Sequence, residues 1–298
     1  MNYISTRGFE GKFSSSEAII RGIAPDGGLF VPETIPQLTK EDLEAMQTME
    51  FYQLSAFVLS KFLTDFTEEE LLDYTRQAYA EEKWGENPIP LVQMNEYNDR
   101  EYILELWHGP TCAFKDVALQ LLPHLMTASA KKTGTHKKIC ILTATSGDTG
   151  KAALEGFKDI PGTEIIVFYP TGGVSEAQKL QMTTTGGSNT HVIAVNGCFD
   201  DAQTGVKRIF GDMEFAITLD DHDTMLSSAN SINWGRLAPQ IAYYVYSYVE
   251  LLRKGKIDLT ESFNIVVPTG NFGNILAAWF AKQMGIPVHK LICASNRN

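Results

Sequence analysis

The chain has 298 residues, of which 44% are apolar and 20% are charged. A chain of this size and composition is expected to bury a sizeable core and has room for two domains. Its formal net charge of −11 argues against a general nucleic-acid binder, because a surface of that charge repels phosphate.

The first 85 residues are predicted to form a mainly helical N-terminal domain. They contain no apolar run of the signal-peptide kind, and no run in the chain approaches the length of a membrane span. We therefore expect a cytoplasmic protein without a membrane partner. Residues 25–28 (Pro-Asp-Gly-Gly) are typical of a turn. Helices are predicted over residues 54–63 and directly after Thr67, which forms a capping-box pattern with Glu70.

From about residue 100, short β-rich runs alternate with helical stretches. The runs cover residues 102–106, 138–143, 164–169, 191–195, 263–267 and 288–293. Several are continuous apolar runs of the kind buried on both faces of a parallel sheet, and their alternation with helices is the βαβ pattern.

This pattern predicts two α/β domains beside the N-terminal domain of residues 1–85. The large one is expected to contain residues 86–112 and 215–298, and the small one residues 113–214. The last apolar run is followed by only five residues, so no helix remains to cover its strand. We therefore expect the large domain to be incomplete at its C-terminal end.

Three glycine-containing turns, each between a predicted strand and a helix, are candidate binding sites. They lie at residues 143–150, 228–236 and 268–274. Backbone N–H groups at a helix start suit a carboxylate or a phosphate, and Arg236 could grip a phosphate with two donors. Each turn alone is ordinary loop chemistry. On one parallel sheet, however, the three would meet at the same edge, which predicts a binding site there.

Lys115 follows the predicted strand at 102–106 and a Gly-Pro turn, at the start of an apolar helix. A helix N-terminus and an apolar setting both lower the pKa of an ammonium, which favours the neutral amine that a Schiff base needs. A reactive lysine with separate cradles for a phosphate and a carboxylate is what a pyridoxal-phosphate (PLP) enzyme acting on an amino acid requires.

Metal, nucleotide and disulfide chemistry are poorly supported. The sequence has no HExxH, no GxGxxG and no complete P-loop, and its six histidines show no ligand spacing. The cysteines form no CxxC pair, which argues against a zinc site and a disulfide framework; they are Cys112, Cys140, Cys198 and Cys293. We expect no metal site.

Four segments in this order resemble the threonine synthase family: HGPTCAFKD (108–116), TATSGDTG (143–150), SANSIN (228–233) and PTGNFGN (268–274). Residues 5–8 (STRG) and 25–30 (PDGGLF) add to the resemblance, which spans essentially the whole chain and is strongest to the longer bacterial and fungal branch. It implies the α/β fold of the fold-type II, tryptophan synthase β-like PLP enzymes, with parallel-rich sheets flanked by helices.

The resemblance also implies roles for particular residues. Lys115 would be the Schiff-base lysine and the acid/base, and Asp148 would lie near the phenolic oxygen of the cofactor. The PLP phosphate would be held by backbone N–H groups of Gly270, Asn271, Phe272, Gly273 and Asn274. The α-carboxylate of the substrate would be bound by Ser146, Gly147 and Thr149. The phosphate of O-phospho-L-homoserine would be bound by Asn230, Ser231, Asn233 and Arg236.

The implied reaction converts O-phospho-L-homoserine and water into L-threonine and phosphate, by γ-elimination of phosphate and β-addition of water. The family also has a hydroxyl side chain opposite the pyridine nitrogen, from a segment later than Asn298. Two alternatives stay open: another fold-type II PLP lyase such as a serine or threonine dehydratase, or a folded but inactive fragment or relative. The protein is expected to be a monomer or a homodimer.

Overall fold

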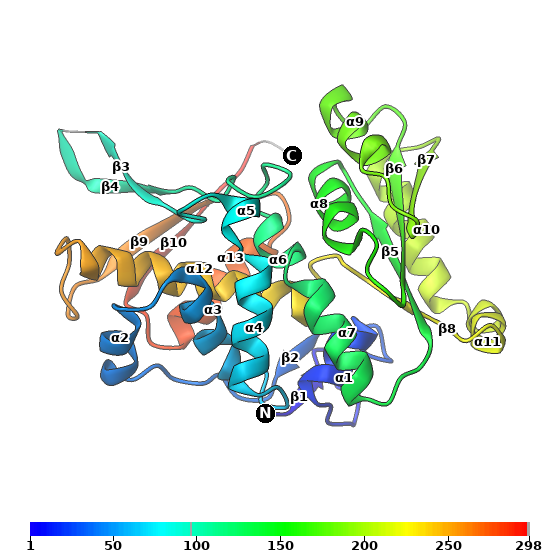
Figure 1. Cartoon of the computed structure of the whole chain (residues 1–298), viewed down its shortest axis with the longest axis horizontal. Helices are drawn as coiled ribbons and strands as arrows, with labels where there is room; N and C mark the ends of the chain where they lie inside the picture. The colour runs from blue at the N-terminus through cyan, green and yellow to red at the C-terminus, as the bar shows by residue number, and fades with distance from the viewer. Residues whose placement is uncertain (96, 297–298) are drawn as a thin grey trace.

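The N-terminal region is mainly helical, as predicted (blue to cyan in Figure 1). The computed structural model describes residues 1–95 and 97–296. Two short antiparallel strands, β1 (Tyr3–Ser5) and β2 (Phe30–Pro32), open the region. Its helices are α1 (Ser15–Arg21), α2 (Lys40–Met46), α3 (Phe51–Ser60), α4 (Glu68–Ala78) and α5 (Glu81–Trp84). Thr67 caps α4 in a capping box with Glu70, which confirms the predicted start of that helix.

A four-stranded parallel sheet in the order β7-β6-β5-β8 confirms the predicted βαβ pattern. Its strands are β5 (Lys138–Ala144), β6 (Thr163–Pro170), β7 (Thr190–Val195) and β8 (Thr224–Ser227). The intervening helices are α8 (Asp148–Phe157), α9 (Glu176–Thr184), α10 (Phe199–Gly211) and α11 (Met213–Asp221). Because β8 pairs with β5, this sheet extends past residue 214, where the small domain was predicted to end.

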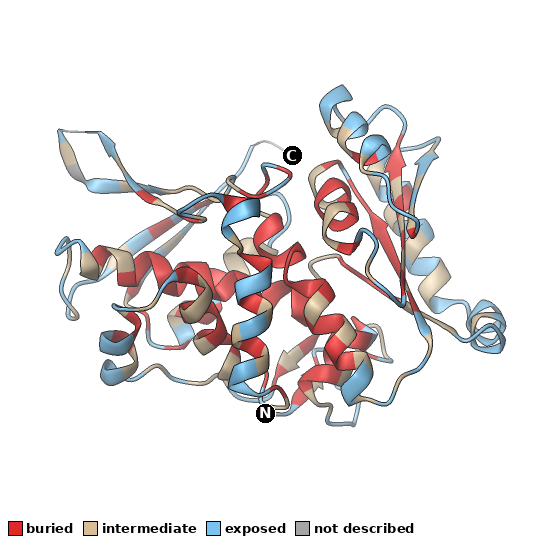
Figure 2. Cartoon of the chain, in the orientation of Figure 1, coloured by how far each residue is buried: buried red, intermediate tan, exposed pale blue. Residues whose placement is uncertain are grey.

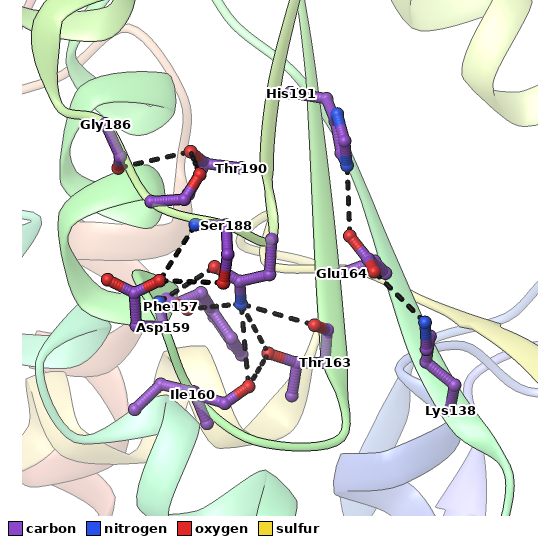
Figure 3. Close-up of polar contacts among 12 residues, drawn as sticks. Lys138, Phe157, Asp159, Ile160, Thr163, Glu164, Gly186, Ser188, Thr190 and His191 are labelled. Atoms are coloured by element: carbon purple, nitrogen blue, oxygen red, sulfur yellow. Dashed lines mark hydrogen bonds and ion pairs between the residues drawn. The ribbon is translucent and has the colours of Figure 1, made fainter.

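A buried asparagine, Asn189, fixes one end of this sheet; Figure 3 labels its partners Phe157, Asp159 and Thr163. Asn189 donates from Nδ2 to the carbonyl oxygens of Phe157 (2.9 Å) and Thr163 (3.2 Å), and its Oδ1 accepts from the N–H of Asp159 (2.8 Å). The Asp159 carboxylate in turn accepts from the N–H and the hydroxyl of Ser188. These bonds join the turn before β6 to the turn before β7 and fix the amino ends of these two strands. The candidate turns lie at the opposite, carboxyl edge of the sheet, after β5 and β8.

Two further pairs of strands lie outside that sheet. β9 (Phe263–Pro268) and β10 (Val288–Ala294) pair in parallel. The predicted strand at residues 102–106 is found as β4 (Asn98–Leu104) and pairs antiparallel with β3 (Leu91–Asn95). The short connection between β3 and β4 permits a hairpin but not the crossover that a parallel pair needs.

The expectation of one sheet under all three turns is therefore wrong. The turns at 143–150 and 228–236 follow β5 and β8 of the four-stranded sheet, whereas the turn at 268–274 follows β9 of a separate sheet. Figure 1 shows the two sheets on opposite sides of the central helices. The sequence pattern indicates strands, but which strands pair depends on contacts far apart in the chain.

The core lies between the sheets, around α12 (Trp234–Arg253), which is buried along most of its length (Figure 2). Its neighbours include α6 (Asp116–Leu119), α7 (Leu122–Lys132) and α13 (Gly273–Gln283). The indole of Trp234 contacts the rings of Tyr3, Phe62 and Phe280 at centroid distances of 5.3–5.5 Å. Within the described ranges, no helix combines the length and the apolar character needed to cross a bilayer.

Candidate active site

Lys115 lies at the N-cap of α6, as predicted, and the loop before it is held by the next residue along the chain. The buried Asp116 carboxylate accepts hydrogen bonds from the N–H (2.9 Å) and the hydroxyl (2.7 Å) of Thr111. Gly109 approaches so closely that a Cβ there would lie 2.6 Å from the Cβ of Asp116, so only glycine fits. These contacts fix the turn that aims Lys115.

The Lys115 side chain is only 18% exposed, and its Nζ lies 4.3 Å from the centre of the Phe114 ring. Burial lowers the pKa of Lys115 to about 8; the Asp148 carboxylate opposes this shift, and the positive charges of Arg236 and Lys151 add to it. A sizeable share of the amine is therefore neutral near physiological pH, as a nucleophile or a proton acceptor requires.

The turn after β5 is shaped by Thr145, whose hydroxyl accepts from the N–H groups of Gly147 (2.9 Å) and Gly150 (2.8 Å). Gly147 has φ +131°, and a Cβ there would lie 2.3 Å from the side chain of Gln178 on α9. Glycine is therefore required at this position, and its N–H is already engaged within the turn. Ser146 is exposed and Thr149 is partly buried, so both are accessible to a ligand.

Asp148, the first residue of α8, faces two lysines and an amide. Its Oδ1 accepts from Nε2 of Gln178 (2.9 Å) and lies 3.2 Å from Nζ of Lys151, while its Oδ2 lies 3.8 Å from Nζ of Lys115. Partial burial alone would raise the pKa of Asp148, but the hydrogen bond from Gln178 and the charges of Lys115 and Lys151 outweigh burial, and the pKa is lowered. Asp148 is thus a carboxylate at neutral pH.

Arg236, in the first turn of α12, is 1% exposed. Its Nη1 donates to the carbonyl oxygen of Ala229 (2.8 Å), whereas its Nε has no hydrogen-bond partner in the part of the chain that the structure describes. Burial lowers the pKa of Arg236 to about 10, so the guanidinium remains charged at neutral pH. A buried cation with an unused donor, whose charge acts on Lys115, is suited to an anion such as phosphate.

The two predicted asparagines in this turn differ. Asn230 is tied to the end of β5 by a bond from Nδ2 to the carbonyl of Ala144 (3.4 Å), and its buried Oδ1 has no partner among residues 1–95 and 97–296. Asn233 is fully buried and caps α12: its Nδ2 donates to the carbonyls of Ile19 and Ser228 (both 2.9 Å), and its Oδ1 accepts from the N–H of Gly235 (2.8 Å). Both N–H groups of the Asn233 amide are used by the protein, which leaves none for a ligand.

The turn after β9 provides an open backbone cradle. A Cβ on Gly270 would have no atom within 4 Å, so a ligand can approach the main chain there, and α13 begins at Gly273 without a side-chain cap. Asn271 and Phe272 are exposed. A Cβ on Gly273 would lie 2.9 Å from Cβ of Ser231, which brings this turn against the turn that precedes α12. The Asn274 amide oxygen accepts from the hydroxyls of Tyr243 (2.6 Å) and Tyr244 on α12.

The four predicted segments therefore meet, although they come from different sheets. Together they offer a partly neutral buried amine, an open N-terminal cradle and a second buried cation, a donor set that fits a phosphorylated aldehyde cofactor and an anionic substrate.

The sequence reasoning missed Lys151 and Gln178. The three-residue spacing of Asp148 and Lys151 indicates that both lie on one face of α8, which is a signal for Lys151. The capping box of Ser175 and Gln178 is a signal that places Gln178 at the start of α9.

Two family models together match nearly the whole chain. Residues 2–79 match the model described as threonine synthase N terminus. Residues 83–298 match the model described as pyridoxal-phosphate dependent enzyme.

Similar proteins are found among curated sequences and solved structures. The threonine synthases of Schizosaccharomyces pombe and Pseudomonas aeruginosa are 40% and 39% identical to the whole chain, which spans 57% and 60% of their lengths. The crystal structure of PLP-bound threonine synthase from Brucella melitensis is 40% identical, with a TM-score of 0.85, over 99% of this chain and 60% of that one. The chain thus spans a little under two thirds of the length of these relatives.

Proposed function

Because the chain belongs to the family of pyridoxal-phosphate-dependent enzymes, we propose that it forms part of a threonine synthase, which converts O-phospho-L-homoserine and water into L-threonine and phosphate. The observation that carries this proposal is Arg236, a fully buried guanidinium whose Nε has no partner among the described residues and whose charge lowers the pKa of Lys115. The match of residues 2–79 to the threonine synthase N terminus supports the same substrate.

The residues divide into three binding groups. Lys115 would hold the cofactor covalently through Nζ, and the backbone of residues 270–274 would receive its phosphate. Ser146 and Thr149 would bind the substrate carboxylate at the start of α8. Arg236, Asn230 and Ser231 would bind the substrate phosphate, while Asn233 and Gly147 keep their loops in shape through the bonds already described.

Lys115 is also the residue that moves protons. When bound, pyridoxal phosphate supplies an electron sink for carbanion chemistry at the carbons next to the substrate amine. The neutral Nζ of Lys115 takes a proton from the substrate carbon and returns one later. Arg236 holds the departing phosphate in line, so that the leaving group is oriented and its charge is stabilised.

The domain division and the cellular setting are part of the same proposal. The pairing of β8 with β5 favours a small α/β domain that runs from about residue 113 to Ser227, with residues 86–112 and those after Ser227 in the large domain. We propose a cytoplasmic monomer or homodimer that binds no nucleic acid, in keeping with its charge of −11.

Phosphate release from O-phospho-L-homoserine by the chain supplied with PLP tests this function. We expect Arg236→Ala to lower kcat/KM by about 10²–10³-fold, because it removes a preorganised donor from the phosphate. Arg253→Ala, at the other end of the same helix, is the matched control and should retain kcat/KM. Wild-type turnover by Arg236→Ala, or turnover of serine but not of the phosphorylated substrate, would contradict the assignment and favour a dehydratase.

A further inference from the structure

Lys151 is a second buried lysine in the site, and nothing in the proposed reaction uses it. It lies one turn after Asp148 on α8, and its side chain is only 8% exposed. Lysine is rarely buried without a partner or a role, because removing an ammonium from water is unfavourable. Its ion-pair partner is the Asp148 carboxylate at 3.2 Å, which is also the nearest carboxylate to Lys115.

The contacts of Asp148 are unequal. Its Oδ1 has both short contacts, from Lys151 at 3.2 Å and from Gln178 at 2.9 Å, whereas Lys115 lies 3.8 Å from Oδ2, beyond hydrogen-bond length. Asp148 is 40% exposed, so it has room to change rotamer. Without Lys151, the carboxylate would keep only one neutral donor at Oδ1 and would be drawn towards the nearest remaining cation, Lys115.

We propose that Lys151 is a positioning residue for Lys115: it competes with Lys115 for the Asp148 carboxylate and so prevents a close ion pair that would lock Lys115 as an ammonium. The role rests on the proposed function, in which Lys115 must act as a free amine. It assigns to Lys151 no contact with substrate or cofactor.

The charges that face Lys115 agree with this role. They are Asp148 and Lys151 from α8, Arg236 from α12 and Asp116 from α6. After burial and the Asp148 carboxylate, the two cations act in the same direction and lower the pKa of Lys115. Replacing Lys151 with a neutral residue removes one of these cations and also releases Asp148, and both changes raise the pKa of Lys115.

The test measures the amine itself and does not depend on turnover. Trace acetylation of Lys115 in the cofactor-free chain, quantified by peptide mass spectrometry across pH, gives the midpoint at which Nζ becomes reactive. We expect a midpoint near pH 8 in the wild type and a rise of about one pH unit in Lys151→Met. Lys151→Arg keeps the charge and should restore the wild-type midpoint.

Lys132→Met is the matched control. Lys132 lies on α7, away from the site, and like Lys151 it forms an ion pair with a carboxylate, that of Glu70 at 2.8 Å. It makes the same charge change and should leave the midpoint unchanged. If Lys151→Met does not fold, Lys151→Gln keeps a hydrogen bond to Asp148 without the charge and should still raise the midpoint. An unshifted midpoint in a folded neutral variant, or an equal shift in Lys132→Met, would overturn the proposal.

Phosphate release from O-phospho-L-homoserine is measured on the same preparations. A shifted midpoint in a chain that releases no phosphate would support the role of Lys151 and count against the proposed function. Phosphate release with an unshifted midpoint would overturn the role of Lys151 alone.

Discussion

The role proposed for Lys115 comes at the expense of stability. Its pKa of about 8 in the folded chain lies below the ordinary lysine value of 10.5, so between these pH values the unfolded chain binds more protons than the native one. By linkage, the free energy of unfolding rises with pH through this window, and the cost of the buried ammonium is fully present below pH 8. A residue chosen for stability alone would not be ionisable at this position.

Lys115→Met should therefore abolish turnover and stabilise the fold. At pH 7 we expect its free energy of unfolding to exceed that of the wild type by about 3.5 kcal/mol, because 2.5 pKa units at about 1.4 kcal/mol each are relieved. The difference should shrink towards zero near pH 10.5. Urea unfolding at both pH values measures it, with Lys132→Met as the control for simple loss of a charge. A variant less stable than the wild type at pH 7 would contradict this account.

At the scale of elements, the start of α12 matters most, because it joins the N-terminal region, the turn after β8 and Arg236, the residue proposed to bind the substrate phosphate. Asn233→Ala removes three buried hydrogen bonds, two from Nδ2 and one to Oδ1. We expect a loss of roughly 3 kcal/mol in the free energy of unfolding, since each leaves a buried group unsatisfied. Thr67→Ala, which removes the exposed cap of α4, should cost only about 1 kcal/mol. Equal losses in urea unfolding would show that Asn233 is an ordinary cap.

Elements were predictable from sequence where their signals are local. Thr67 and Glu70 lie three residues apart and mark the start of α4, and the apolar run at 138–143 identifies β5 by itself. Pairing was not predictable in the same way. β4 turns back on β3 and β9 pairs only with β10 among the described strands, because register is decided by partners that the run itself does not encode.

The site also divides into residues with local sequence signals and residues whose roles depend on contacts between distant segments. Lys115, Arg236 and the three turns could be selected as candidates because their residue types are informative in short segments. For Lys151 the spacing from Asp148 indicates only a shared helix face; its burial, and the contact of Asp148 with Gln178 of α9, exist only in the folded chain. Asn233 is the converse case: the resemblance implies a ligand contact, whereas in the fold its amide donates to the carbonyls of Ile19 and Ser228.

At the scale of the whole molecule, the site joins segments that no single sheet connects. Lys115 starts α6, Asp148 starts α8, Arg236 lies on α12 and the backbone cradle precedes α13. A ligand that contacts several of them, as PLP would contact Lys115 and the cradle, binds only the native arrangement, because the unfolded chain cannot bring these groups together. Its binding free energy is then added to the stability of the whole chain.

PLP should accordingly raise the unfolding temperature of the 298-residue chain as its concentration increases. At a hundredfold excess over Kd we expect about 2.7 kcal/mol of added stability and a rise in Tm of roughly 5 °C or more. Lys115→Met keeps the cradle but lacks the amine, so its Tm should rise much less at the same concentration. Circular dichroism melts at several PLP concentrations measure both. A Tm of the wild type that ignores PLP would contradict the assembled site, and equal shifts in the two chains would show that Nζ of Lys115 is not where the cofactor is held.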